Sequence, residues 1–347
     1  MGARLGNTAR TRRLVASAAR VLSHPDGTVP QKMGSAAHLS GLYHLLACDR
    51  VTHRSVFDAH RRLTLDRMAA HPVVLVVNDT TELDYAHVAA LAEALGPIGN
   101  GNRRGYICHN SLAVTPDARV LGLASQVLHR RRVVPPAETP SAKRDHPGRE
   151  SRLWLRGCEA VGPAPTGPGT DAPLWVDVCD RGADTVEFIE YEVSSGRHFV
   201  IRAAKDRNLD GQDFDHFGRH GDRIHRKLLA YARDLPALGT RALEVPAEAG
   251  KSKARAATLA VSSGPLRLRA SRFARGHCEG VPLDLWVVHV LEADPPPGVR
   301  PLEWVLLTDL PADTFEKACE RVDWYARRPL IEDYHKASGS ATARERV

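Results

Sequence analysis

The sequence predicts an α/β protein with a helical N-terminal segment and a strand-rich second half. Residues 73–77 and 174–179 are runs of apolar and β-branched residues, typical of strands buried on both faces of a sheet. Arginine-rich segments of helical periodicity precede the first run, and several strand-like segments follow the second. With 347 residues, the chain is long enough for a large core in two or three structural units.

The positive charge of the chain is concentrated in its first fifth. The formal net charge is +7, and residues 1–70 hold 11 Lys and Arg against 4 Asp and no Glu, so the remainder is balanced. Such a segment favours contact with a polyanion such as double-stranded DNA, because neutralising phosphates releases counterions. The alternative is a well-solvated basic face.

Composition also excludes several classes of protein. No stretch approaches 18 uncharged apolar residues, so we expect no membrane span, and the first thirty residues lack the pattern of a secretory signal. We therefore expect a cytoplasmic protein, associated with the nucleoid if it binds DNA. The six cysteines form no C-x-x-C pair, which predicts reduced thiols rather than a zinc site or a disulfide framework.

Three helices are expected in residues 1–70. Residues 5–22 have the periodicity of an amphipathic helix, with Arg12 and Arg13 largely away from its apolar side. That apolar side consists of Leu14, Ala18, Val21 and Leu22. A second helix is expected at 36–48, and Thr52 is placed to cap a third. The three predict a small, Arg-rich bundle.

The next elements alternate between strands and helices. The strand at 73–77 ends at Asp79, and residues 107–114 and 120–128 predict a hairpin that turns at 115–119. Residues 133–172 read as a surface connection with a short helix at 151–160. A second buried strand ends at Asp180 and is followed by a helix. Further strands are expected at 198–204, 241–248, 258–271, 282–294 and 302–308, with a possible helix inside 205–237.

Residues 313–336 are expected to form one long helix. Asp313 and Glu316 have the spacing of a capping box at its start. One face of this helix presents Tyr325, Arg328, Glu332 and Lys336 at intervals of three and four. A surface ladder of ion pairs is the alternative interpretation of this face.

Three of the acids form a candidate metal site. Asp79 and Asp180 lie at strand ends and Glu332 on the C-terminal helix, and a hard cation such as Mg²⁺ prefers carboxylate ligands. Two such ions catalyse phosphoryl transfer in many enzymes. The alternatives are a capping role for Asp79 and an ion pair between Asp180 and Arg181.

Four blocks resemble, in order, the conserved blocks of insertion-sequence-four-type DDE transposases, the group that includes the Tn-five transposase. The blocks are 78–85, 105–111, 176–184 and 325–336. The resemblance runs from the first helix to Lys336. It implies an N-terminal DNA-binding domain at 1–70 and an RNase H-like core at 71–195 and 300–347, with a β-rich insertion at 196–299.

The resemblance also implies roles for individual residues. Asp79, Asp180 and Glu332 would be the catalytic triad that binds two Mg²⁺ ions, for which Mn²⁺ can substitute. The residues implied to contact transposon-end DNA are Tyr325, Arg328, Lys336, Trp304 and Arg202, with Arg12 and Arg13 in the N-terminal domain. For Trp304, the family role is stacking near a flipped base, and a core aromatic is the alternative.

The implied function is DNA cleavage and strand transfer at inverted-repeat ends, with a homodimer on the DNA. The chain departs from the family pattern at Gly182, Pro329 and Gly339, and relatives continue beyond the position of Val347 into a helical pairing region. A truncated copy that only binds DNA is therefore the alternative function. An unrelated metal-dependent nuclease with the same core is a third.

Overall fold

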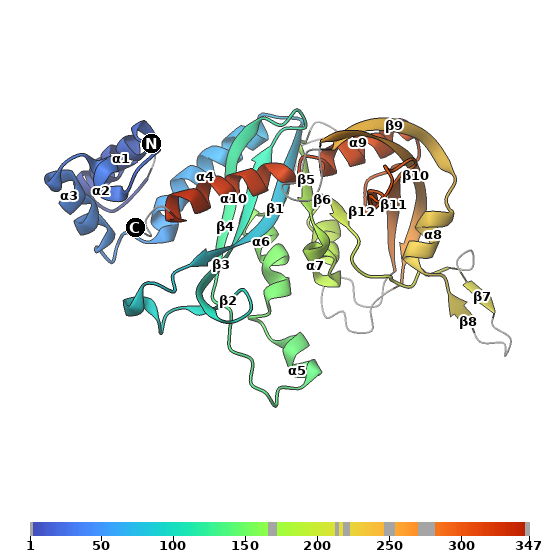
Figure 1. Cartoon of the computed structure of the whole chain (residues 1–347), viewed down its shortest axis with the longest axis horizontal. Helices are drawn as coiled ribbons and strands as arrows, with labels where there is room; N and C mark the ends of the chain where they lie inside the picture. The colour runs from blue at the N-terminus through green and yellow to red at the C-terminus, as the bar shows by residue number, and fades with distance from the viewer. Residues whose placement is uncertain are drawn as a thin grey trace.

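The computed structural model describes residues 3–165, 172–211, 215–217, 223–245, 254–269 and 282–343, and within them ten strands form one mixed sheet (Figure 1). Its strands are β1 (Val73–Asp84), β2 (Gly96–Ile98), β3 (Arg103–Val114), β4 (Val120–His129), β5 (Leu174–Cys179), β6 (His198–Arg202), β9 (Ala237–Val245), β10 (Arg255–Leu268), β11 (Leu283–Glu292) and β12 (Glu303–Thr308). The strand order is β2-β3-β1-β5-β6-β12-β11-β10-β9, with β4 also paired to β3. The expected α/β class is confirmed.

The first half of the sheet combines both strand directions. β1 pairs antiparallel with β3, and β3 pairs antiparallel with β4, whose predicted hairpin closes through Thr115 and Arg119. On its other side, β1 pairs parallel with β5, and β5 pairs parallel with β6. Val74 to Val77 are fully buried, as expected for a strand covered on both faces.

The strand-rich second half continues the same sheet. β12 pairs antiparallel with β6, and β11, β10 and β9 follow in antiparallel order. The predicted strands are present. The ends of two of them, residues 246–248 and 270–271, lie outside the described residues, as does Cys278. A separate hairpin is formed by β7 (Asp215–Phe217) and β8 (Arg223–His225), and the helix expected in 205–237 is α8 (Leu228–Asp234).

The N-terminal helices divide between a small cluster and the sheet. α1 (Thr8–Ser23), α2 (Val29–Met33) and α3 (Ala36–Leu46) pack on one another, whereas α4 (His53–Ala69), capped by Thr52, packs on β4. The predicted apolar side of α1 was wrong at its last turn, because Val21 and Leu22 are exposed. Arg20 turns inward there instead and donates to the Met33 carbonyl at 3.0 Å.

Helices cover both faces of the sheet in the first half (Figure 1). α6 (Leu153–Val161) and α7 (Val186–Ser194) lie on one face, and α6 is buried along one side rather than lying on the surface as expected. α5 (Pro140–Asp145) belongs to the connection before it. The other face is covered by α9 (Phe315–Tyr325) and α10 (Pro329–Ala343), and α10 contacts β1.

The single helix expected at 313–336 is two helices. α9 ends at Tyr325, and α10 begins at Pro329, because proline has no N–H to continue the helical ladder and disfavours helical geometry at the residue before it. The predicted capping box was also wrong. Thr314, not Asp313, caps α9 by accepting from the Lys317 N–H, while Asp313 pairs with the Lys317 ammonium at 2.8 Å.

Buried apolar side chains fill both sides of the sheet. One core cluster lies beneath α9 and α10, and the others lie beneath α6, α7 and α4. Among the described residues, every helix is too short or too polar to cross a lipid bilayer. Cys48, Cys108, Cys158, Cys179 and Cys319 are free thiols.

Gly182 follows Asp180 and Arg181 in sequence, and close packing leaves no room for a side chain at this position. A Cβ atom there would lie 2.1 Å from Cζ2 of Trp154, a largely buried ring. We expect Gly182→Ala to lower the free energy of unfolding by about 1–3 kcal/mol, the usual cost of overpacking. Urea unfolding measures this change. The exposed neighbour Arg181→Ala is the control and should stay within about 0.5 kcal/mol of the parent; equal stability of the two variants would contradict the packing argument.

Candidate functional site

Asp79 lies within β1, directly after the point where the parallel β1–β5 ladder ends, and Asp180 directly follows β5. The expectation that the first strand ends at Asp79 was wrong, because β1 continues to Asp84 through its pairing with β3. The β1–β5 ladder ends with the pair Asn78 and Cys179, so the next residue of each strand is an aspartate. Asp79 accepts from the Thr80 N–H, and Asp180 accepts from the Gly182 N–H at 2.8 Å. Asp180 therefore caps the short helical turn 181–183 rather than forming the ion pair with Arg181 that the sequence left open.

α10 brings Glu332 to the same place. The Arg328 guanidinium donates to Asp79 Oδ2 at 3.1 Å and also to a carboxylate oxygen of Glu332. Ile331, which directly precedes Glu332, is fully buried and packs the first turn of α10 against the sheet. One cation thus joins two of the three acids.

Burial dominates the electrostatic environment of Asp79. It raises the pKa of Asp79 to about 6, the Arg328 guanidinium opposes that rise, and the carboxylates of Asp180 and Glu332 make smaller contributions to it. A buried carboxyl group takes up a proton more readily than an exposed one. Asp79 is therefore a desolvated carboxyl with one cationic partner and two acidic neighbours.

The donor set fits a hard divalent cation, since all three acids offer oxygen ligands. The oxygen atoms of Asp79, Asp180 and Glu332 do not all lie within 4.8 Å of one another, because no such group of these residues occurs in the described chain. Arg328 holds Asp79 and Glu332 instead. A bound cation would therefore compete with this guanidinium for the same oxygens.

A row of polar side chains extends the site across the sheet. Asn110 of β3 is the register partner of Asp79, and Gln126 of β4 is the partner of Asn110. Gln126 donates to Asn110 at 2.9 Å, and Asn110 contacts His335 of α10 at 3.0 Å. His53 of α4 contacts Gln126 at 2.8 Å. The sequence analysis did not single out these residues, although Asn110 and His335 lie inside two of the resembling blocks.

A pocket of about 220 Å³ adjoins the acids on the side of the strand-rich half. Four of the predicted DNA-contacting residues line it together: Arg202, Trp304, Tyr325 and Arg328. The Trp304 and Tyr325 rings meet edge to face with their centroids 5.0 Å apart. Burial raises the pKa of the Tyr325 hydroxyl, and Arg202 and Arg328 lower it. The lining of the pocket thus combines aromatic and cationic side chains.

The remaining predicted contacts lie elsewhere. Lys336 is largely exposed and pairs with Asp333 at 3.1 Å. Of the two ion pairs that a surface ladder around Glu332 would contain, the pair with Arg328 is present. Arg12 and Arg13 are exposed on α1, and the Arg13 guanidinium lies against Gly41 of α3. None of the three lines the pocket beside the acids.

A second basic feature, which the sequence analysis did not isolate, lies at the start of α4. A hollow of about 410 Å³ is lined by Arg4, Arg54, Ser55, Asp58, Arg61 and Arg62. Arg61 also donates to the carbonyls of Ala160 and Val161 at the end of α6. Four arginines beside one aspartate give this surface a net positive charge suited to a phosphate backbone.

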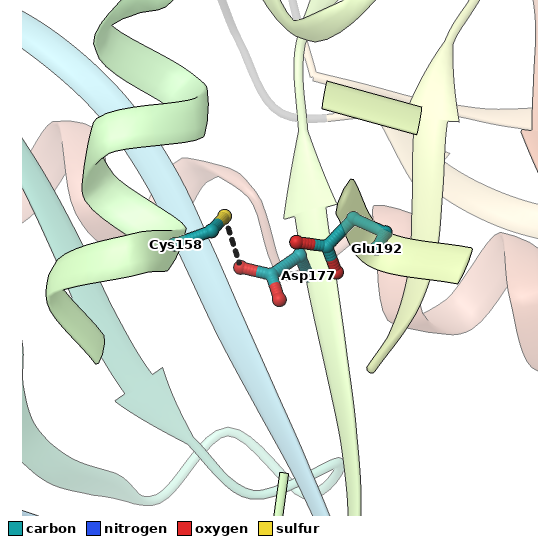
Figure 2. Close-up of side chains that lie close together, drawn as sticks. All are labelled: Cys158, Asp177 and Glu192. Carbon is teal, nitrogen blue, oxygen red and sulfur yellow. Dashed lines mark hydrogen bonds between the residues drawn. The ribbon is translucent and has the colours of Figure 1, made fainter. Parts of the chain in front are cut away.

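One other group of residues has the spacing of a metal site (Figure 2). Cys158 from α6, Asp177 from β5 and Glu192 from α7 point toward one another, and their ligand atoms lie within 4.8 Å. All three are buried. The Arg197 guanidinium pairs with Asp177 and lies 3.5 Å from Glu192, so a bound metal would compete with this guanidinium for the carboxylates.

Because its folded pKa of about 6 is above the ordinary 3.8, Asp79 loses stabilising free energy as the pH rises through 6. Asp79→Asn should therefore raise the free energy of unfolding at pH 8 by up to about 3 kcal/mol, and this gain should vanish below about pH 4. Chemical denaturation at the two pH values measures it. Asp313→Asn is the control, since Lys317 lowers the pKa of that exposed carboxyl and no gain should appear.

No family model matches this chain. Its interpretation therefore depends on the two acids beside the end of the β1–β5 ladder, the helix that brings a third acid to them, and the adjoining pocket.

Proposed function

We propose that the chain is a DNA transposase that cleaves DNA at transposon ends and transfers the freed 3′ end to a target. The observation that carries the proposal is the convergence of Asp79, Asp180 and Glu332, from three distant parts of the chain, beside a pocket lined by aromatic and cationic side chains. Phosphoryl transfer needs carboxylates that hold divalent cations and cations that hold the nucleic acid.

The arrangement of strands supports an RNase H-like core. In the order β4-β3-β1-β5-β6, β3 runs antiparallel to both of its neighbours, and β1, β5 and β6 run parallel to one another. β9 to β12 occupy the interval between Asp180 and Glu332, where the resemblance expects a β-rich insertion. β6 and β12 mark the junction of the two parts, so the insertion would begin after β6 rather than at residue 196.

Asp79, Asp180 and Glu332 would hold the divalent cations, with Mg²⁺ preferred for its affinity for carboxylate oxygen. When bound, two such ions activate the attacking oxygen and stabilise the leaving oxygen. The role of Arg328 follows from its present contacts. Released from Asp79 and Glu332, its guanidinium would lie at the pocket wall, where it can bind a DNA phosphate.

The pocket supports a contact with an unstacked base near the cleavage point. Trp304 offers a ring face or edge, with Tyr325 packed behind it and Arg202 beside it. Aromatic stacking contributes about 1–3 kcal/mol per base, enough to offset much of the cost of unstacking. The exposed arginines of α1 and the arginine-lined hollow at α4 would hold more distant duplex, including the ends recognised by residues 1–70.

A chain that only binds DNA is the second candidate, and one observation favours it. Arg328 pairs with two of the three acids, as in a structural ion-pair network. The two candidates agree on double-stranded DNA as the partner and on location at the nucleoid. A homodimer on DNA belongs to the transposase proposal alone, and a general nuclease would cleave without regard to the ends.

Incubation of the purified protein with end-containing DNA and Mg²⁺ tests the proposal. The parent should nick and then join DNA, and Asp79→Asn should reduce both steps to the protein-free background, because it removes one charged ligand from the site. The Asp313→Asn variant should retain full activity. Nicking by Asp79→Asn at the parent rate would contradict the assignment. Binding without cleavage by the parent would favour the second candidate, and cleavage of random competitor DNA would favour a nuclease.

Trp304→Ala tests the pocket. We expect it to weaken binding of DNA with an unpaired base at the cleavage point by about 1–3 kcal/mol, since one stacking surface is lost. Binding of fully paired, unrelated duplex should change little. Fluorescence anisotropy with both DNAs measures the difference. Trp304→Phe is the matched control, because it retains an aromatic face; equal losses for both variants would indicate a role in packing only.

A further inference from the structure

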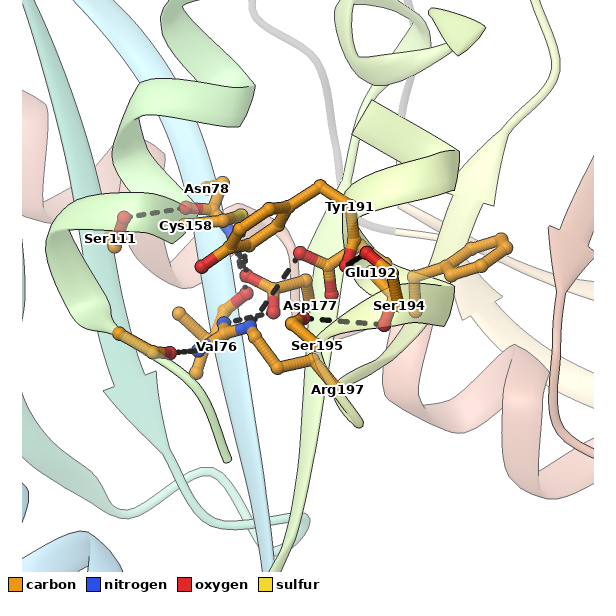
Figure 3. A network of polar contacts seen from close by, with 12 residues as sticks. Val76, Asn78, Ser111, Cys158, Asp177, Tyr191, Glu192, Ser194, Ser195 and Arg197 are labelled. Carbon is orange, nitrogen blue, oxygen red and sulfur yellow. Dashed lines mark hydrogen bonds and ion pairs between the residues drawn. The ribbon is translucent and has the colours of Figure 1, made fainter. Parts of the chain in front are cut away.

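Asn78 is the residue directly before Asp79, and its side chain enters a buried polar network on the opposite face of the sheet (Figure 3). Its amide nitrogen donates to Asp177 Oδ1 at 2.7 Å and to the Val76 carbonyl at 2.9 Å. Asn78 and Asp177 have no exposed surface. This bond joins β1 to β5 shortly before Asp79 and Asp180, the two aspartates that are proposed to be catalytic.

Asp177 is held from the other side by Arg197, which lies immediately before β6. The Arg197 guanidinium pairs with Asp177, donates to the Gly162 carbonyl at 2.8 Å and lies over the Trp175 ring at 5.8 Å. Its side chain is completely buried. Because guanidinium binds carboxylate through a rigid fork of donors, this pair fixes the direction of Asp177 as well as neutralising it.

The network continues across the first half of the sheet. Ser111 of β3 donates to Asn78 Oδ1 at 2.6 Å and contacts Ser125 of β4 at 2.9 Å. Both serines are buried. Side-chain bonds therefore run through β5, β1, β3 and β4 in a line, on the face of α6 and α7.

Asp177, Glu192 and Arg197 balance one another without a metal ion. Burial raises the pKa of Glu192, and the neighbouring Asp177 carboxylate raises it further, so this carboxyl holds its proton. That leaves one negative and one positive charge in contact. Burial likewise keeps the Cys158 thiol protonated, with its Sγ donating to Asp177 at 3.3 Å.

We propose that Asn78, Asp177 and Arg197 are positioning residues that fix β1 against β5 so that the carboxylates of Asp79 and Asp180 converge. The inference rests on the proposed function of those acids. Side chains alternate between the two faces of a sheet along each strand. A slip of β1 by one residue relative to β5 would therefore turn every β1 side chain to the other face and move Asp79 away from Asp180. Outer-shell groups of this kind tune metal sites they do not touch.

Two double variants isolate the Asn78–Asp177 bond. Asp177→Leu/Arg197→Met removes the ion pair and the acceptor for Asn78, and apolar replacement of a buried pair is often neutral for stability. Asp177→Asn/Arg197→Met removes the same charges but retains an acceptor oxygen. Mn²⁺ binding to each protein, without DNA, is measured by titration calorimetry together with the melting temperature.

We expect the leucine variant to bind Mn²⁺ about 10–100-fold more weakly than the parent, and the asparagine variant to bind within a few-fold of it. Equal Mn²⁺ affinity in the parent and both variants would overturn the inference while leaving the proposed function intact. Parent affinity unaltered by Asp79→Asn would overturn both, because the ion would then bind elsewhere.

Asn78→Ala removes the donor of the Asn78–Asp177 bond and provides the same test if the Asp177→Leu/Arg197→Met variant does not fold. It should also weaken Mn²⁺ binding about 10–100-fold. Val287→Ala, in the buried core of the strand-rich half, is its control for lost stability alone. A Val287→Ala protein with a similar melting temperature should retain the parent affinity, and an equal loss in both variants would show that Asn78 acts only through stability.

Discussion

Negative charge gathered where the β1–β5 ladder ends has to be balanced, and the junction between α9 and α10 contributes to that balance. Asp79 is mostly buried beside two other carboxylates, a position that costs free energy whenever all three are ionised. Arg328 offsets part of this cost because α10 restarts at Pro329 and places the guanidinium at the junction between two helices. The same junction forms one wall of the adjoining pocket. Charge balance and pocket shape therefore depend on one break in a helix.

The sheet separates two kinds of polar chemistry. On the face of α10, acids and amides lie partly open and incompletely neutralised. On the face of α6 and α7, the charges of Asp177 and Arg197 are paired, buried and linked to neighbouring strands. Residues 78 and 79 stand next to each other in sequence and belong to opposite faces, since side chains alternate along a strand. A buried, paired network therefore lies directly behind the partly open acids on the other face of the sheet.

Much of the fold was predictable because its central strands begin as continuous apolar runs. The apolar run of β5 ends directly before Asp180 as expected, whereas β1 continues past Asp79 to Asp84, because its polar second half pairs with β3 and shows no apolar run in the sequence. Long-range pairing was not predictable: nothing in the pattern of residues 198–204 or 302–308 indicates that β6 and β12 pair to join two halves of one sheet. Pro329 predicts a kink between Arg328 and Glu332 within one helix, whereas the structure has a complete break between Tyr325 and Pro329. Asn78, Asn110 and Arg197 gave no signal by residue type, because their importance comes from partners distant in sequence.

The pairing of β6 with β12 has a mechanical consequence. Arg202 and Trp304 come from these two strands, and backbone hydrogen bonds tie them across the boundary between the two halves of the molecule. A hinge at that boundary would have to break a sheet ladder, which distinguishes this protein from those that close two lobes around a substrate. The part of the pocket wall that these two strands form is therefore held by backbone pairing. Under the proposed function, the DNA must supply the deformation, and a flexible or already unpaired strand would enter more readily than a stiff, intact duplex.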